Sequence, residues 1–182
     1  MKKANGFTLV ELLVTMSVVA VLVTLAAPSV AGLVQSGNVA SAVNTLLGDL
    51  RFSRSEAVRR GVPVVICRSS APEATSPQCA SDPANTGSGW STGWIIFEDR
   101  DSNASFDSGT DKLLRVQAGL NGIDQIKTPT NSFEFTPMGR QRWQSQNITF
   151  GGDAIAKARQ RLVCVAVTGR ARVAGDGNAS CT

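Results

Sequence analysis

The sequence contains no histidine and no tyrosine, and aromatic residues make up only 5% of its 182 residues. The commonest general base and the commonest zinc ligand are therefore missing. No serine, lysine or carboxylate stands in a known nucleophile pattern such as G-x-S-x-G. The four cysteines are an even number, and their spacing does not fit a zinc ribbon. We predict no enzymatic activity and no cofactor, and we assign no catalytic and no metal-binding residue.

Long apolar runs are also missing after the first thirty residues. The exception is residues 7–27, whose only charged side chain is Glu11. As a helix this run would be about 30 Å long, enough to cross a hydrocarbon core. Lys2 and Lys3 precede it, which by the positive-inside rule leaves the N-terminus in the cytoplasm. A cleavable secretory signal and a plain single-span anchor are alternatives, but both leave Glu11 unexplained.

The segment Gly6-Phe7-Thr8-Leu9-Val10-Glu11 resembles the processing site of type IV prepilins and type II secretion pseudopilins. The resemblance implies that a prepilin peptidase cuts between Gly6 and Phe7 and methylates the new amino terminus of Phe7. It also implies that Glu11 is an assembly residue. Its carboxylate would pair with an α-amine of the same or a neighbouring chain, which relieves the cost of two isolated charges in hydrocarbon.

Apolar residues continue at spacings of three and four from Val30 to Val58, which predicts an amphipathic helix. Arginines near its end suit the helix dipole, and Gly61 and Pro63 terminate it. Beyond it, short apolar runs separated by turn residues predict strands at 64–66, 93–97, 113–116, 132–135, 148–150 and 162–167.

The predicted fold class is α+β, a long N-terminal and partly transmembrane helix packed on an antiparallel β-sheet domain, as in pilins. Antiparallel pairing is expected because no helical segment separates the strands. The predicted parts are a leader (residues 1–6), a transmembrane assembly helix (7–28), the amphipathic half of the same helix (29–61) and a C-terminal β domain (62–182).

Four cysteines allow three disulfide pairings. We favour the local pairs Cys67–Cys79 and Cys164–Cys181, because each would close a polar loop that cannot pack by itself. Between the two pairs, the acidic segment 99–111 resembles the start of an EF-hand loop. Ala104 replaces the required glycine and Thr110 the bidentate glutamate. An Asx-rich turn is the favoured interpretation and a calcium site the alternative.

The last part of the chain is basic and contains two similar segments. In Gly169-Arg170-Ala171-Arg172, strand alternation places both arginines on one face, where they can contact successive phosphates. Gly139-Arg140-Gln141-Arg142 repeats the pattern beside Trp143, which can stack on a base. The alternative is two solvated arginine pairs at turns.

The N-terminal motif, residues 93–99, the turn at 135–139 and the segment 169–172 together resemble the GspH/FimT/FimU family of minor pilins and pseudopilins. The resemblance implies a minor pilin that initiates assembly at the tip of a type IV pilus, with protein H of a type II secretion pseudopilus as the alternative. The implied partners are the prepilin peptidase, other minor pilins or pseudopilins, and the major pilin. The implied location is the inner membrane, single-pass, with the C-terminal domain in the periplasm.

Some FimT-like members bind DNA through their C-terminal Gly-Arg-x-Arg motif during natural transformation. By match to that motif, Arg170 and Arg172 are candidate DNA-binding residues in this sequence. Arg140 and Arg142 fall outside the motif, and they join the candidates on charge alone. We therefore add non-specific DNA to the expected partners.

Overall fold

A long helix begins the described part of the chain. The computed structural model describes residues 7–153 and 155–181, and for residues 25–29 the backbone alone. Helix α1 spans Leu9–Arg60 and ends at Gly61, whose φ of 70° is the left-handed conformation that favours glycine. The chain divides into two compact units, Met1–Gln35 and Ser36–Thr182, so α1 contributes residues to both. Among the described residues, no helix combines the length and the apolarity needed to cross a membrane.

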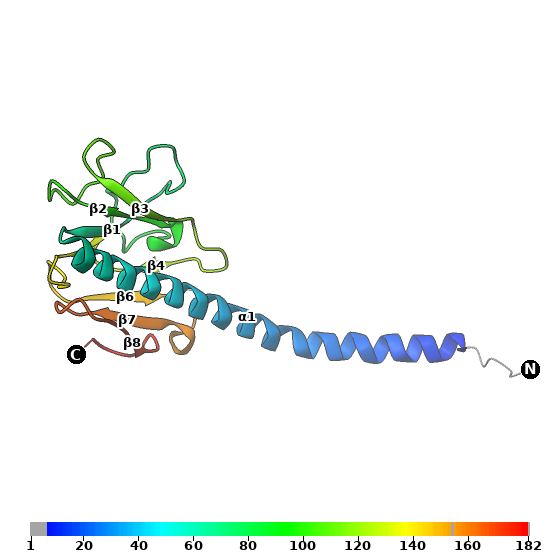
Figure 1. The fold of residues 1–182 in the computed structure, drawn as a ribbon. Coiled ribbons are helices and arrows are strands. Elements are labelled where there is room, and N and C mark those ends of the chain that lie inside the picture. The colour runs from blue at the N-terminus through cyan, green and yellow to red at the C-terminus, as the bar shows by residue number, and fades with distance from the viewer. Residues whose placement is uncertain (1–6, 154, 182) are drawn as a thin grey trace, which may run out of the picture. The chain divides into compact units, whose positions relative to one another are not determined.

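Two antiparallel sheets follow α1 in the chain (Figure 1). Sheet A has the strand order β3-β2-β1-β5, and sheet B has the order β4-β6-β7-β8. The bounds are β1 (Val64–Arg68), β2 (Trp94–Glu98), β3 (Lys112–Gln117), β4 (Ile126–Lys127), β5 (Ser132–Phe135), β6 (Gln146–Phe150), β7 (Arg161–Val165) and β8 (Ala171–Gly175). Short 3₁₀ helices η1 (Trp90–Thr92) and η2 (Lys157–Arg159) precede β2 and β7.

The predicted α+β class is confirmed, and the strands divide into two sheets. The strands expected from the sequence all occur, within a few residues of their predicted ends. The sequence does not predict β4, because two residues are too few to show a period. It also does not predict β8, which is composed largely of small residues and begins only two residues after a turn glycine.

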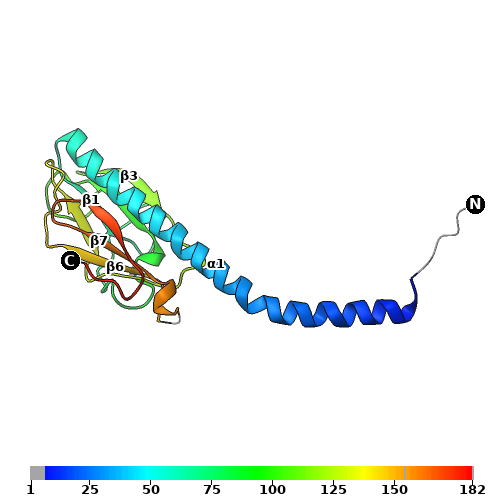
Figure 2. The same ribbon diagram turned by 90° about the horizontal axis from the view of Figure 1, so that it is seen from below.

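The part of α1 after Ser36 packs against both sheets. Figures 1 and 2 show this part of the helix lying along β1, β2 and β3 and along β6, β7 and β8. Buried apolar side chains recur along it at the predicted spacings of three and four: Val39, Ala42, Val43, Leu46, Leu47, Leu50 and Ala57. Val58 belongs to the same predicted stripe but is exposed, because it borders an open groove.

Strands β1 and β2 are buried on both faces. Every residue of each strand is buried, which is why the sequence shows continuous apolar runs here and no alternation. Trp94 and Ile96 face the core that contains α1. Ile95 and Phe97 face the opposite way, into a second cluster that includes Phe106. Sheet A is therefore covered by α1 on one face and by loops on the other.

A buried carboxylate fastens α1 to sheet A. Asp49 is 3% exposed, and its Oδ2 accepts a hydrogen bond of 2.8 Å from the indole Nε1 of Trp94. Its Oδ1 pairs with Arg115 of β3, whose guanidinium carbon also lies 4.0 Å from the centre of the Phe52 ring. A buried carboxylate is costly unless its oxygens are satisfied. These contacts therefore fix which turn of α1 faces β2 and β3.

Both disulfides join cysteines that are close in sequence. Cys67–Cys79 links β1 to the loop that follows it, with a Cα–Cα distance of 5.5 Å. Cys164–Cys181 links β7 to the tail after β8, with a Cα–Cα distance of 5.6 Å. These are the two local pairs that the sequence favours. Each holds a largely exposed polar segment against a buried strand.

Replacing Asp49 with alanine is expected to destabilise the fold by about 2–4 kcal/mol, because the buried Trp94 N–H loses its acceptor. Urea unfolding of the full-length chain in detergent, followed by tryptophan fluorescence, measures the change. Asn44→Ala, at an exposed position of the same helix, is the control and should change the free energy of unfolding by less than about 0.5 kcal/mol. Equal stability of the two variants would show that the carboxylate does not hold the helix.

Candidate functional site

The first turn of α1 carries the residues that the processing motif marks as functional. Gly6 and the rest of the leader, residues 1–6, lie outside the described residues. Phe7 is exposed, and the hydroxyl of Thr8 accepts a hydrogen bond of 3.3 Å from the N–H of Glu11. Threonine followed three residues later by glutamate is the spacing of a capping box. Thr8 therefore caps the N-terminus of α1. The spacing of Thr8 and Glu11 in the sequence could have predicted this cap.

Apolar side chains are exposed on all sides of the helix that follows. Between Phe7 and Val23 the exposed large apolar residues are Phe7, Leu9, Val10, Leu12, Leu13, Val14, Met16, Val18, Val19, Val21, Leu22 and Val23. Soluble monomers rarely expose so large a contiguous apolar surface. Glu11 is exposed among these side chains. This segment therefore presents a continuous apolar surface with one carboxylate near its start.

Two hairpin turns of the same design explain why the Gly-Arg pattern occurs twice. In the first, the Gly139 N–H donates to the Thr136 carbonyl and the Thr136 N–H donates to the Arg140 carbonyl, both at 2.8 Å. The equivalent bonds in the turn Ala166–Arg170 are 2.8 and 3.0 Å. The glycines have φ of 72° and 78°, as a three-residue hairpin loop with a G1 bulge requires.

The two turns pack against each other and against α1. A Cβ placed on Gly169 would lie 2.1 Å from the carbonyl oxygen of Gly139. A Cβ on either glycine would lie 3.2 Å from Nε of Arg54. Only glycine permits this approach, so the pair of turns places the start of β8 directly beside α1.

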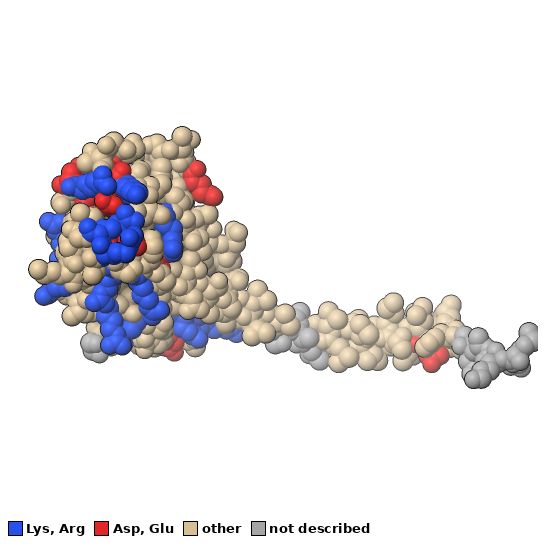
Figure 3. Space-filling view, in the orientation of Figure 1, with Lys and Arg blue, Asp and Glu red and all other residues tan. Residues whose placement is uncertain are grey.

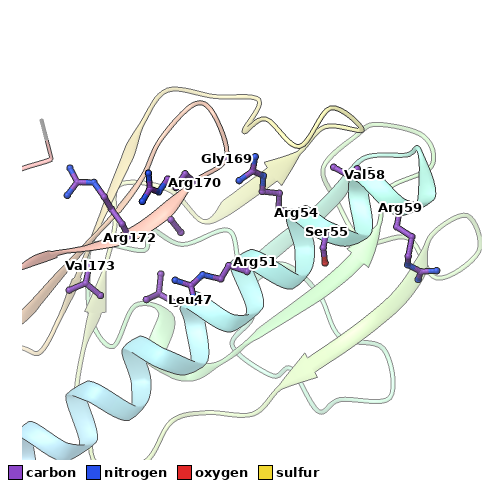
Figure 4. Close-up of a pocket in the computed structure, with 11 residues that line it drawn as sticks. Leu47, Arg51, Arg54, Ser55, Val58, Arg59, Gly169, Arg170, Arg172 and Val173 are labelled. Carbon is purple, nitrogen blue, oxygen red and sulfur yellow. The ribbon is translucent and has the colours of Figure 1, made fainter.

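A groove of about 670 Å³ lies between α1 and β8 (Figure 4). One wall is formed by α1 and the other by the consecutive residues 169–173. Leu47, Ala171 and Val173 make the groove apolar in part, whereas arginines from both walls give it positive charge. Figure 3 shows Lys and Arg side chains gathered over the end of α1 and over sheet B.

Four arginines give the groove its charge. Arg170 and Arg172, the two arginines of the Gly-Arg-x-Arg segment, come from the turn and β8, and Arg51 and Arg54 come from α1. Figure 4 shows Arg51 and Arg54 extending from the helix toward residues 169–173. From the sequence alone, Arg51 and Arg54 are two of the arginines near the helix end that suit the helix dipole. The missed signal is their spacing of four and seven residues from the buried Leu47, which places them on the same side of the helix.

Arg59 also borders the groove, but its charge is compensated. Its Nη2 lies 2.6 Å from a carboxylate oxygen of Glu56, which also bonds Arg60. Hydrogen bonds from Arg59 and Arg60 lower the pKa of Glu56 to about 2, against the opposing effect of burial. Figure 4 shows Arg59 pointing away from residues 169–173.

Arg140 and Arg142 do not line this groove, so the structure does not bring them together with Arg170 and Arg172. They border a separate cavity of about 440 Å³ beside Met138. The Arg142 N–H donates to the Glu134 carbonyl at 2.9 Å. This cross-strand position brings its guanidinium onto the buried Glu134 carboxylate. Glu134, and after it Asp99, raise the pKa of Arg142, so this arginine faces acidic groups.

The acidic segment after β2 forms an Asx-rich turn. Asp99, Asp101 and Asp111 each place an oxygen within 4.8 Å of the others. Asp99 accepts hydrogen bonds from the N–H groups of Asn103 and Ala104 at 3.3 and 3.0 Å, and Asp101 accepts one from Asn103 at 3.3 Å. Burial, together with Asp101 and Asp111, raises the pKa of Asp99. Backbone N–H groups of the turn thus hold the carboxylates of Asp99 and Asp101, as in the Asx-rich turn that the sequence favours.

Comparison with known proteins identifies two family models. The model described as type II transport protein GspH matches residues 42–169, and the model of the prokaryotic N-terminal methylation motif matches residues 1–27. No curated protein matches the sequence significantly.

Two solved structures with a similar fold are crystal forms of the Pseudomonas aeruginosa (strain PAO1) type IV minor pilin FimU. The P21 form is 16% identical, with a TM-score of 0.56, and covers 79% of this chain and 95% of FimU. The P65 form is 17% identical, with a TM-score of 0.55, and covers 76% and 97%.

Gly169→Ala is expected to destabilise the fold by about 1–3 kcal/mol, because the new Cβ meets the Gly139 carbonyl and the backbone φ is positive. Gly48→Ala is the matched control. Its Cβ meets nothing within 4 Å, and alanine in a helix interior should stabilise by about 0.5–1 kcal/mol. Urea unfolding of both variants measures these opposite signs. A neutral Gly169→Ala would mean that the two turns do not pack tightly.

Proposed function

The chain belongs to the GspH family of type II transport proteins and carries the prokaryotic N-terminal methylation motif, and on this basis we propose that it acts as a minor pilin. In this role it is a non-catalytic structural subunit that enters a type IV pilus at its tip and helps to initiate assembly. The observation that carries the proposal is the exposed apolar helix with Glu11 in its first turn. Such a surface needs neighbouring helices or lipid to cover it.

Before assembly we expect residues 7–28 to cross the inner membrane once and residues 62–182 to lie in the periplasm. The apolar run and the lysines before it support this orientation. Two disulfides in the C-terminal part suit an oxidising compartment. The prepilin peptidase would cut between Gly6 and Phe7, which frees an α-amine close to Glu11. Other minor pilins and the major pilin are the partners that would cover the helix.

The description of the family model favours a second candidate, a minor pseudopilin (protein H) of a type II secretion system. The same helix and the same processing would serve that fibre. Deleting the gene separates the candidates, because a minor pilin affects surface piliation and a pseudopilin affects secretion of folded enzymes. The exposed Arg170 and Arg172 favour the pilus, since a pilus tip can meet nucleic acid outside the cell.

Non-specific DNA binding is the finer role that the groove supports. Guanidinium groups form bidentate hydrogen bonds with phosphates. Five arginines line one groove, of which Arg59 is paired with Glu56. Neutralising two to four phosphates corresponds to a Kd of about 10⁻⁴ to 10⁻⁶ M. Arg170 and Arg172 remain the proposed contacts. Arg142 is less suited, because Glu134 occupies its guanidinium.

Glu11→Ala is expected to be processed normally but to enter filaments at well under a tenth of the normal level. Without the carboxylate, the α-amine of Phe7 has no partner in an apolar surrounding. Immunoblots of sheared filaments measure incorporation, and N-terminal mass analysis confirms cleavage before Phe7. Glu11→Asp, which keeps the charge, is the control. Normal incorporation of Glu11→Ala would contradict the proposal. So would a mature chain beginning at Gly32, which would mean cleavage as a secretory signal after the A-x-A-like sequence Ser29-Val30-Ala31.

Arg170→Gln combined with Arg172→Gln is expected to weaken binding of duplex DNA by about tenfold or more and to reduce the salt slope by about 2. Mobility shifts at several salt concentrations provide the measurement. Lys112→Gln with Lys157→Gln is the control, because it removes the same charge from exposed positions outside the groove. Arg140→Gln should have a smaller effect than the first pair. Unchanged shifts for the first pair would remove Arg170 and Arg172 from the site.

A further inference from the structure

The outer edge of β8 is open. β8 is the last strand of sheet B and pairs with β7 on its other side. The Ala166 N–H donates to the Arg170 carbonyl at 3.0 Å. Because hydrogen bonding alternates along an antiparallel strand, the backbone groups of Ala171 and Val173 point away from β7. Within the described residues these groups have no backbone partner. An edge of this kind is a template for another strand.

A strand placed along this edge would meet two different surfaces. Ala171 and Val173 stand opposite Val165 and Val163 of β7, which belong to the core. Their side of the groove is apolar and includes Leu47 of α1. Arg170 and Arg172 stand on the other face, because side chains alternate along a strand. The groove therefore presents apolar groups on the inner side and guanidinium groups on the outer side.

The opposite wall adds charge of the same sign. Arg51 and Arg54 extend from α1 toward β8 (Figure 4). Neither belongs to an ion pair within the described residues. Among the described residues that line the groove, none carries a carboxylate side chain. A ligand that complements this groove must place negatively charged groups near the arginines and apolar groups against Leu47, Ala171 and Val173.

We propose that the groove receives an extended segment of another protein subunit, in which acidic and apolar side chains alternate, and that the segment pairs with β8 as an added strand of sheet B. Its backbone bonds the outward groups of Ala171 and Val173. Its apolar side chains lie against Leu47 and Val173, and its carboxylates meet the arginines. Main-chain pairing gives affinity, and alternate side chains give specificity. The inference rests on the proposed role as a fibre subunit, where a neighbouring subunit supplies the segment.

A peptide strand would use features of the groove that nucleic acid does not use. β8 has five residues, and at about 3.3 Å per residue its edge is about 16 Å long, the length of an ordinary strand. Phosphates would use the arginines but neither the apolar floor nor the open N–H groups. The N–H of Val173 therefore discriminates between a peptide strand and DNA.

The probe is a synthetic hexapeptide of alternating glutamate and valine, blocked at both ends. Binding to the full-length chain in detergent is followed by calorimetry, and amide exchange reports protection. We expect saturable binding that protects the amides of Ala171 and Val173. A hexapeptide of alternating lysine and valine should not bind. Absence of saturable binding at millimolar peptide, or binding without protection of these amides, overturns the proposal.

Two variants separate backbone pairing from charge. Val173→Pro removes the outward N–H and should bind the peptide about tenfold more weakly than Val173→Thr, which changes the same side chain but keeps the N–H. Proline is tolerated on an edge strand, and urea unfolding checks the fold. Arg51→Glu leaves β8 untouched and should weaken the glutamate peptide while allowing the lysine peptide to bind.

Unchanged peptide binding by Val173→Pro, or by Arg51→Glu, contradicts the proposal. A short DNA duplex that protects the same amides more strongly than the peptide would assign the groove to nucleic acid instead. Filament incorporation tested with Glu11→Ala is independent of these outcomes. If the peptide does not add to β8, the proposed role as a fibre subunit is unaffected. If the chain does not enter filaments, the incorporation assay shows this independently of peptide binding.

Discussion

The arrangement of the C-terminal unit depends on one buried carboxylate. Asp49 holds the indole of Trp94 and the guanidinium of Arg115, and together they fix the axial and rotational position of α1 on sheet A. A helix moved by one turn would leave the buried N–H of Trp94 without its acceptor and would separate Asp49 from Arg115. Once this position is set, the residues two and five places after Asp49 are directed at β8. The cationic wall of the groove is therefore a consequence of how the helix is anchored on the other sheet.

The second constraint is the contact between the two turn glycines. It brings the end of sheet B against α1, and a groove lies between α1 and β8. The ion pairs at the end of the helix play a different part. Glu56 and Glu98 bind Arg59, Arg60 and Arg100 and so remove charge from the region where α1 meets sheet A. On the side that faces β8, Arg51 and Arg54 form no ion pair with any residue that the structure describes.

Much of the fold follows from local sequence signals. Helical spacing predicts which side of α1 is buried, and short apolar runs predict the principal strands. The local disulfides follow from the polar loops they close. The groove does not follow, because it joins residues 47–58 with residues 169–173, and no local pattern encodes that proximity. The same limit applies to Asp49, whose partners lie in β2 and β3. Arg142 is a different case. Its Gly-Arg-x-Arg-like segment is easily recognised in the sequence and suggests DNA binding, but the structure pairs Arg142 with Glu134 across the strands, which makes that role less suitable.

The disulfide between Cys164 and Cys181 also dictates where the molecule can be labelled. It returns the last residues of the chain to the outer face of β7, beside Arg170 and Arg172. An affinity tag or fluorescent protein fused after Thr182 would therefore lie next to the surface whose binding it is meant to report. Removal of the leader would take away a tag at the other end. An exposed loop such as residues 85–88, remote in sequence from both walls of the groove, is the better place for a reporter.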